Sequence, residues 1–168
     1  MFFDRTIGVR LPRLLKKIRK LPFGVAYHED CFKKDERDDV WLPEVGMRGW
    51  FVIGQDYRYH ARPTELDAIK ENKIGCFYLW GSQAPQWDYV RVFAKSYYNL
   101  ASIALTVPRP FLYVVNHQAD VRPWGLNSKR IPFGKSPKRL PIPQGSVALP
   151  EASLLIAART ASPLDPPN

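Results

Sequence analysis

The sequence predicts an α/β fold, a three-layer sandwich in which helices cover both faces of a mostly parallel central sheet. Two observations predict it. Short runs that are apolar from end to end recur along the chain, which is typical of strands buried on both faces. Segments with helical spacing of apolar residues separate these runs, and strands that alternate with helices favour a parallel sheet. The expected strands are residues 2–3, 24–27, 50–56, 74–80 and 111–115.

The segments between these strands are expected to form helices. Apolar residues recur at helical spacing over residues 11–21 with Lys and Arg between them, so this helix has a basic outer face. A short second helix is capped by Asp38 or Asp39, and Pro63 begins a third because proline is favoured in a first helical turn. Residues 86–105 carry a long apolar stripe that predicts a core-facing helix.

The composition changes at about Arg122, which divides the chain into a domain over residues 1–121 and a tail over residues 122–168. The tail contains nine prolines, seven basic residues and two acidic ones. This composition predicts a proline-rich, basic and disordered C-terminal tail. Such a tail either helps to hold a polyanion or is simply solvated, and the sequence leaves both readings open.

The composition limits the class of protein. With 168 residues the chain is long enough for one well-buried domain, and its formal net charge of +9 favours polyanions such as nucleic acid, although solubility alone also explains such a charge. Cys31 and Cys76 form no zinc-ligand pattern, which fits a reducing compartment. We expect neither a signal peptide nor a segment that spans a bilayer, because an acid occurs at position 4 and Pro150 and Glu151 interrupt the longest late apolar stretch. We therefore expect a cytoplasmic protein without a membrane partner, and whether it forms a homodimer stays open.

Acidic residues lie where predicted strands end. Asp4 follows the first strand and Asp56 ends the third, while Asp38 and Asp39 begin the helix that leads into that third strand. Ligand sites in open parallel sheets lie outside the carboxyl ends of the strands. We therefore expect the carboxylates of Asp4, Asp56 and one of the two adjacent acids to meet at one edge of the sheet.

Three converging carboxylates repel one another unless a proton or a cation neutralises them. Oxygen ligands of this kind suit Mg²⁺ or Mn²⁺. In a basic protein such a cation indicates phosphodiester chemistry, in which the metal activates a water molecule and basic residues hold the backbone. Thr6, two residues after Asp4, is placed to hydrogen-bond a carboxylate or a metal-bound water. His28, His60 and His117 are scattered singly, so a histidine-based site is not expected.

A longer pattern connects these acids to a known family. An opening FFD at Phe2–Asp4 precedes DDVWLPEVGMRGWFVIGQD at Asp38–Asp56, and RYHARPTELDA follows at Arg58–Ala68. Residues 2 to about 115 thereby resemble the PIN-like domains related to VapC toxins, in which FxD precedes D-x-x-W-[IL]-P-x-x-G-x-x-G-W-x-[IV]-x-x-x-D. The tail lies outside this resemblance.

The resemblance implies a metal-dependent ribonuclease fold, with Asp4, Asp38 and Asp56 as the catalytic and metal-binding acids. Asp38 is preferred to Asp39 because it lies three residues before Trp41. Our leading hypothesis is an endoribonuclease, the toxin of a toxin–antitoxin pair, whose partners are RNA and an antitoxin protein. The basic residues expected to hold RNA are Arg58, Arg62, Arg13 and Lys17.

Two alternatives remain. The family often has Asn near position 6 and Thr-Arg before the last acid, whereas this chain has Thr6, Gly54 and Gln55, and it has no clear fourth acid. The domain could therefore bind RNA or a partner protein without cutting. A receiver-like phospho-acceptor is less favoured: Ser82 follows the fourth strand as in such domains, but no lysine follows the fifth.

Overall fold

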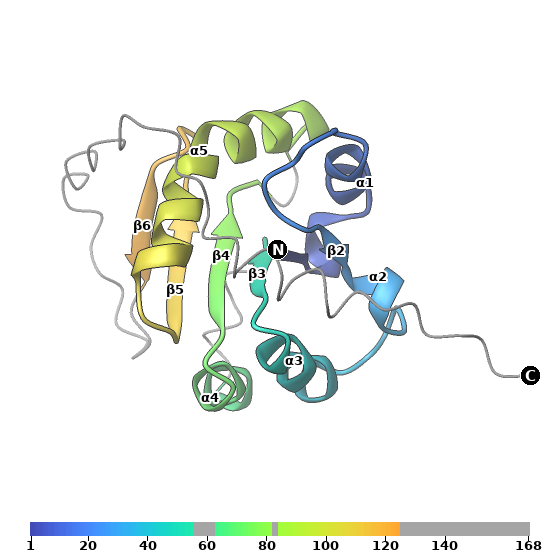
Figure 1. The fold of residues 1–168 in the computed structure, drawn as a ribbon, viewed down its shortest axis with the longest axis vertical. Coiled ribbons are helices and arrows are strands. Elements are labelled where there is room, and N and C mark those ends of the chain that lie inside the picture. Colours follow the sequence, from blue (N-terminus) through green and yellow to red (C-terminus); the bar gives the residue numbers. More distant parts are fainter. Residues whose placement is uncertain (56–62, 82–83, 125–168) are drawn as a thin grey trace, which may run out of the picture. The chain divides into compact units, whose positions relative to one another are not determined.

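A computed structural model describes residues 1–55, 63–81 and 84–124 of the chain. Its core is one six-stranded sheet in the order β2-β1-β3-β4-β5-β6, in which β6 alone runs antiparallel to its neighbour (Figure 1). The strands are β1 Phe2–Phe3, β2 Ala26–Tyr27, β3 Phe51–Gly54, β4 Gly75–Leu79, β5 Phe111–Val115 and β6 Val121–Trp124. The helices are η1 Arg5–Ile7, a 3₁₀ turn, and α1 Arg10–Lys16, α2 His28–Cys31, α3 Asp38–Met47, α4 Pro63–Glu71 and α5 Gln86–Thr106. The predicted α/β architecture with a mostly parallel sheet is confirmed.

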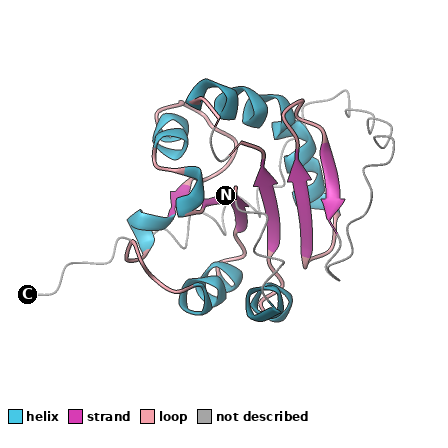
Figure 2. Cartoon of the chain, turned by 180° about the vertical axis from the view of Figure 1, so that it is seen from behind, coloured by secondary structure: helices cyan, strands magenta, loops and turns pink. Residues whose placement is uncertain are grey.

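Helices cover both faces of the sheet, and each face has its own hydrophobic core (Figures 1 and 2). Adjacent residues of a strand point to opposite faces, so Phe3 and Phe77 pack with α1 and α5 while Phe2 and Cys76 pack with α3 and α4. Phe2, Phe3 and Phe77 are all fully buried. The burial of both faces explains why the strands are apolar from end to end.

The strand order brings β1 directly beside β3. Phe2 pairs with Val52 and Phe3 with Ile53, while on its other side Phe3 pairs with Tyr27 of β2. All three strands run in the same direction, so their carboxyl ends lie at the same edge. The residues that follow them are therefore neighbours in space although they are far apart in the sequence.

Three apolar positions that the sequence places in the core are exposed in the structure. Helix α1 ends at Lys16, which leaves Ile18 beyond its last turn with 48% of its surface exposed. Leu14 is also largely exposed, because the buried stripe of this short helix is formed by Leu11 and Leu15. In α5 the predicted core position Trp87 is 72% exposed and lies in the first turn of the helix, which begins at Gln86.

The folded region continues past the predicted domain boundary at residue 121. Val121–Trp124 form β6, which pairs antiparallel with β5, so residues 122–124 belong to the sheet. Residues 125–168, which make up the rest of the predicted tail, lie outside the described residues. None of the helices within the described ranges is long and apolar enough to cross a membrane.

Helices α3 and α4 approach each other closely at Gly46. A Cβ atom at this position would lie 2.7 Å from the backbone oxygen of Asn72 and 2.9 Å from its Cβ. Real Cβ atoms do not come so close to backbone, so a larger residue forces the two helices apart. Gly46 therefore sets the distance between the end of α3 and the end of α4.

We predict that Gly46→Ala lowers the free energy of unfolding by about 1–3 kcal/mol, the usual cost of inserting a methyl group where no space exists. Urea denaturation monitored by circular dichroism measures this change. Gly24→Ala is the matched control, because a Cβ atom there meets nothing within 4 Å. Equal stability of the two variants would contradict the close approach.

Candidate functional site

The first acid of the site, Asp4, directly follows β1 and is only 1% exposed. Its backbone N–H donates to the carbonyl oxygen of Ile53 at 2.9 Å, which continues the pairing of β1 with β3 by one residue. Its side chain lies on the same face as Phe2, toward α3 and α4, because it is two residues further along the strand. The sheet thus buries a carboxylate at its carboxyl edge.

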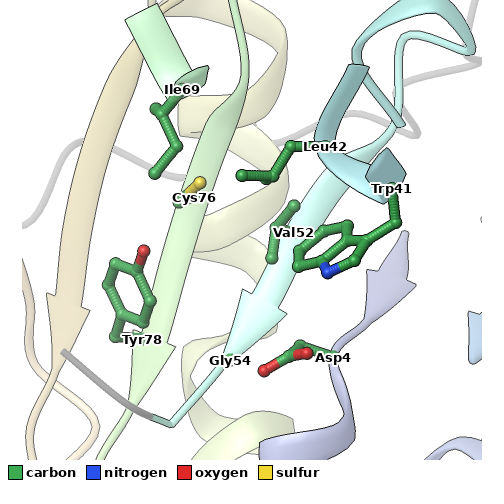
Figure 3. A pocket seen from close by; sticks show the side chains of 8 residues that line it. All are labelled: Asp4, Trp41, Leu42, Val52, Gly54, Ile69, Cys76 and Tyr78. Atoms are coloured by element: carbon green, nitrogen blue, oxygen red, sulfur yellow. The ribbon is translucent and has the colours of Figure 1, made fainter. Parts of the chain in front are cut away.

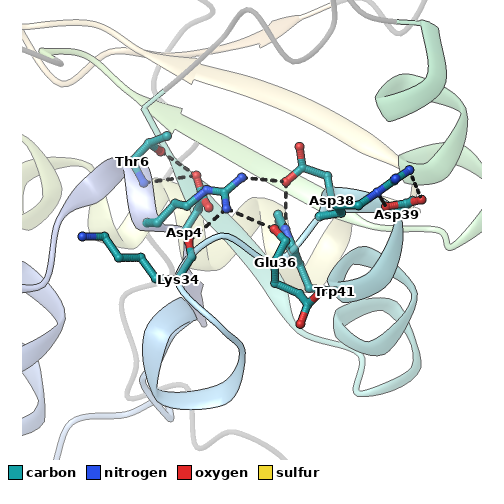
Figure 4. A network of polar contacts seen from close by, with 9 residues as sticks. Asp4, Thr6, Lys34, Glu36, Asp38, Asp39 and Trp41 are labelled. Atoms are coloured by element: carbon teal, nitrogen blue, oxygen red, sulfur yellow. Dashed lines mark hydrogen bonds and ion pairs between the residues drawn. The ribbon is translucent and has the colours of Figure 1, made fainter.

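Thr6 holds one oxygen of this carboxylate (Figure 4). Its hydroxyl donates to Asp4 Oδ2 at 2.6 Å and its backbone N–H donates to the same oxygen at 3.3 Å. The hydroxyl oxygen also accepts the backbone N–H of Gln55 at 3.1 Å. Thr6 therefore joins the end of β1 to the end of β3, and it makes the carboxylate contact that its spacing in the sequence predicts.

The other oxygen of Asp4 has no hydrogen-bond partner among the described residues. Oδ1 is buried and accepts no hydrogen bond among the described residues. Burial raises the pKa of Asp4 above its usual value, and the hydrogen bonds from Thr6 oppose this effect. A buried carboxylate whose second oxygen accepts no hydrogen bond is destabilised in its charged form, and binding a proton or a cation removes this cost. This property fits a metal ligand.

Asp38 begins α3, and its side chain is 16% exposed. Its Oδ1 accepts the indole N–H of Trp41 at 2.8 Å, the residue one helical turn later. The spacing of Asp38 and Trp41 noted in the sequence therefore corresponds to a hydrogen bond that fixes the carboxylate. The same oxygen accepts Arg5 Nη2 at 3.4 Å, so Asp38 faces the end of β1.

The neighbouring acid, Asp39, points away from this edge (Figure 4). Its side chain is 61% exposed and forms an ion pair with Arg37, with Nη2–Oδ2 at 2.8 Å. The hydrogen bonds from Arg37 lower the pKa of Asp39. Of the two acids that the sequence offered for this position, Asp38 is the one whose surroundings include the end of β1.

Arg5 links the two parts of the site. Its Nη1 donates to the carbonyl oxygens of Lys34 at 3.1 Å and Glu36 at 3.0 Å, and its Nη2 reaches Asp38. The guanidinium group thereby fastens the segment before α3 to the end of β1. It also places a fixed positive charge next to one of the two acids, which a bound cation would have to tolerate.

Sequence reasoning missed two buried polar residues at this edge. His28 follows β2 and is fully buried, and neither ring nitrogen has a hydrogen-bond partner among the described residues. Burial lowers the pKa of His28, and the charge of Asp4 opposes this effect. Gln55 is 6% exposed, and its Nε2 also lacks a partner within the described ranges. The available signal was position alone, since His28 follows one predicted strand and Gln55 lies at the end of another.

A small pocket opens beside Asp4 (Figure 3). Apart from Asp4, its walls are largely apolar, with Leu42 from α3, Ile69 from α4 and Tyr78 from β4. Its volume of about 10 Å³ is close to the minimum for one water molecule. It therefore has room for water beside the carboxylate and none for a nucleotide base.

The structure brings Asp4 and Asp38 to one edge, and the third predicted acid, Asp56, lies outside the described residues. Within residues 1–55, 63–81 and 84–124, no three His, Cys, Asp or Glu side chains gather closely enough to hold a metal ion. The predicted RNA-binding residues Arg13 and Lys17 are exposed on α1 and just beyond its end. Arg58 and Arg62 fall outside the described residues.

We predict that Asp4→Asn stabilises the metal-free protein at neutral pH. Because burial raises the pKa of Asp4 in the folded state, ionisation favours the unfolded chain, and this cost grows as the pH rises above about 4, the ordinary pKa of an aspartate side chain. The melting temperature of the variant should exceed that of wild type by a few degrees at pH 7.5 in EDTA. The difference should shrink as the pH falls through about 4 and vanish near pH 3, where Asp4 is protonated in both states. A gain that does not depend on pH would contradict this origin.

Comparison with known protein families gives a match. Residues 1–81 match the family model described as PIN like domain. Comparisons with curated proteins and with solved structures give no match. The matched segment runs from β1 through β4 and includes all three predicted acids, Asp4, Asp38 and Asp56. Residues 1–81 of this chain therefore match the PIN-like domain family.

Proposed function

We propose that this protein is a metal-dependent endoribonuclease that hydrolyses RNA phosphodiesters. PIN domains are commonly nucleases, and the fold by itself does not establish an activity. The observation that carries the proposal is the Asp4 carboxylate, 1% exposed, with Oδ1 unpartnered among the described residues at the carboxyl ends of parallel strands. Such a group is costly to keep unless it has a function.

The residues proposed to hold Mg²⁺ or Mn²⁺ are Asp4, Asp38 and Asp56. When bound, such a cation supplies a water molecule of lowered pKa and neutralises charge on the phosphoryl oxygens. The chain's own contribution is orientation. Thr6 holds Asp4 Oδ2, which leaves Oδ1 available, and Trp41 fixes Asp38 through its indole N–H.

RNA binding is proposed to use basic residues around this edge. Arg13 and Lys17 are exposed, and Arg58 and Arg62 follow Asp56 closely in the sequence. The formal net charge of +9 supports attraction to a polyanion. The resemblance to VapC-related domains supports extending the proposal to the toxin of a toxin–antitoxin pair, with an antitoxin protein as its partner.

One observation favours a second candidate, a PIN-like domain that binds RNA or a partner protein without cutting. Arg5 already donates to Asp38 at 3.4 Å, and its guanidinium supplies positive charge where a cation would otherwise be needed. A site neutralised in this way holds a metal ion less tightly. The two candidates therefore differ in metal affinity and in turnover.

We predict that Asp4→Asn and Asp56→Asn each lower the rate of RNA cleavage with Mn²⁺ by at least about 100-fold, since each removes a charge on which the reaction depends. Single-turnover cleavage of a labelled RNA measures the rate. Asp39→Asn is the matched control, because Asp39 points to solvent and pairs with Arg37. Equal rates in wild type and Asp56→Asn would eliminate the nuclease assignment. RNA binding by wild type without cleavage would favour the second candidate.

The charge of Arg5 gives a further test. We expect Arg5→Gln to raise the affinity for Mn²⁺ by about 10-fold, because it removes a positive charge adjacent to Asp38. Isothermal titration calorimetry measures the affinity, and circular dichroism checks that the variant is folded. Arg37→Gln, which removes a positive charge beside the exposed Asp39, should leave the affinity unchanged. The same affinity in wild type and Arg5→Gln would show that Arg5 does not oppose the metal.

A further inference from the structure

An exposed indole follows β4 at the carboxyl edge of the sheet. The backbone N–H of Trp80 donates to the carbonyl oxygen of Val115 at 2.8 Å, which continues the pairing of β4 with β5 by one residue. The side chain of Trp80 is nevertheless 43% exposed, whereas every residue of β4 itself is buried. The sheet therefore presents a large aromatic ring to solvent from a backbone position that pairing holds in place.

His117, which follows β5, adds a second ring to this surface. Its ring centroid lies 5.6 Å from that of Trp80, and the two ring planes are inclined at 57°. The rings therefore do not stack face to face on each other, and both residues remain exposed. We call this pair the Trp80–His117 platform.

Hydrogen bonds fix the turn that carries His117. Asn116 Oδ1 accepts the backbone N–H groups of Gln118 and Asp120, both at 2.9 Å. From α5, Arg91 Nη2 donates to the carbonyl oxygen of His117 at 3.2 Å. A support of this kind lowers the entropy that a binding surface loses when a ligand arrives.

The residue after Trp80 packs against α5. A Cβ atom at Gly81 would lie 2.9 Å from the Cβ atom of Ala84 and 3.2 Å from Cε1 of Tyr89, and the φ of Gly81 is 107°. Glycine is the residue that adopts such a backbone conformation without strain. The chain therefore turns tightly after Trp80, and the start of α5 lies close to the platform.

Basic side chains lie at the start of α5. Arg10 is exposed, and its Nη1 donates at 3.1 Å to Oε1 of Gln86, the first residue of α5. Lys95 is exposed one helical turn after Arg91, on the same side of the helix. Because Arg91 itself pairs with Asp88 at 3.3 Å, Arg10 and Lys95 are the better candidates for contacts with phosphate groups.

Exposed aromatic rings beside basic groups suit a single strand of nucleic acid. Every base has a π face that stacks on an aromatic ring, while cations hold the backbone. In the sheet, β4 lies two strands from β1, which is about 10 Å at the usual strand spacing. Tyr78, two residues before Trp80, lines the pocket beside Asp4. A few nucleotides of one strand therefore suffice to connect the platform with Asp4.

We propose that the Trp80–His117 platform stacks an unpaired base of single-stranded RNA beside the proposed metal site. The inference rests on the proposed function and adds to it a substrate class and a residue that touches the base. It changes the view from the sequence, in which Trp80 is the last residue of a buried strand. Stacking needs no metal ion, so it is measurable in EDTA, where metal-dependent cleavage does not occur.

The test measures binding of the full chain to a fluorescently labelled oligoadenylate of about ten nucleotides, by anisotropy in EDTA. We expect Trp80→Ala to weaken binding about 5- to 100-fold, the usual effect of removing one stacking ring. Trp80→Phe keeps a ring and should lose less. Tyr98→Ala is the matched control and should bind as wild type does. Tyr98 is 72% exposed but lies about 18 Å along α5 from its first residue.

Two further measurements distinguish stacking from a change of structure. The slope of log affinity against log salt concentration reports phosphate contacts, so it should be the same in wild type and Trp80→Ala. The bases of a duplex are already paired, so affinity for the duplex of the same probe with oligouridylate should also be equal. A changed slope, or equal losses on the single strand and the duplex, would overturn the stacking role. If Trp80→Ala does not fold, Trp80→Leu removes the ring and keeps apolar bulk.

The outcomes separate this inference from the proposed function. Equal affinity for the single strand in wild type and Trp80→Ala, together with RNA cleavage that Asp56→Asn abolishes, would overturn the platform and leave the nuclease standing. That result would favour a protein partner for the exposed indole. Weaker binding by Trp80→Ala, together with no RNA cleavage by wild type in Mn²⁺, would overturn the nuclease and leave the platform standing. Wild type that does not bind the single strand would overturn the platform.

Discussion

The hydroxyl group of Thr6 joins the ends of the two central strands, and the candidate site depends on this contact. The hydroxyl donates to Asp4 at 2.6 Å and accepts from the backbone of Gln55 at 3.1 Å. One side chain therefore orients the first acid and fixes the backbone that leads directly to Asp56. Gly54 lies next to this contact, and a Cβ atom there would lie 3.6 Å from the Thr6 hydroxyl and 3.4 Å from the ring of Tyr78, which are ordinary van der Waals distances. The residues Thr6, Gly54 and Gln55, which depart from the pattern of the related domains, here form one connected structure.

The other features of the site concern the buried polar groups next to this contact. One oxygen of the buried Asp4 accepts hydrogen bonds from Thr6, and the other has no partner among the described residues. The fully buried His28 follows β2, the strand paired with β1. A sheet edge optimised for stability alone would carry apolar or paired residues at these positions. Proteins accept such local conflicts where function requires them, because the charge or lone pair is used when a ligand binds. Arg5 moderates the conflict by bringing a positive charge to Asp38.

The fold could be predicted from the sequence because both faces of the sheet are buried. Apolar runs marked β3, β4 and β5, and the helical stripe marked α5, since burial acts on every residue of these elements. The choice of Asp38 over Asp39 came from its spacing to Trp41, and the indole hydrogen bond is its physical basis. Short elements were less predictable. The end of α1 depends on local backbone geometry, and β6 on pairing with a strand already in place.

The burial of His28 could not be identified from the sequence because it depends on tertiary contacts. Nothing near it in the chain distinguishes it from a loop residue, and its burial comes from Phe2, Phe32 and Trp41, which are brought together by the order of the strands. The same holds for Arg5, whose partners Glu36 and Asp38 lie more than 30 residues away. Contacts of this range are set by topology, and local patterns do not encode them.

The central claim is that the carboxyl edge of β1 and β3 binds the catalytic metal. Anomalous diffraction from a crystal of the full chain soaked in Mn²⁺ tests it most directly. Our account predicts one strong anomalous peak in contact with Asp4 Oδ1. No peak at this edge, or a peak confined to surface acids such as Asp39, would contradict it.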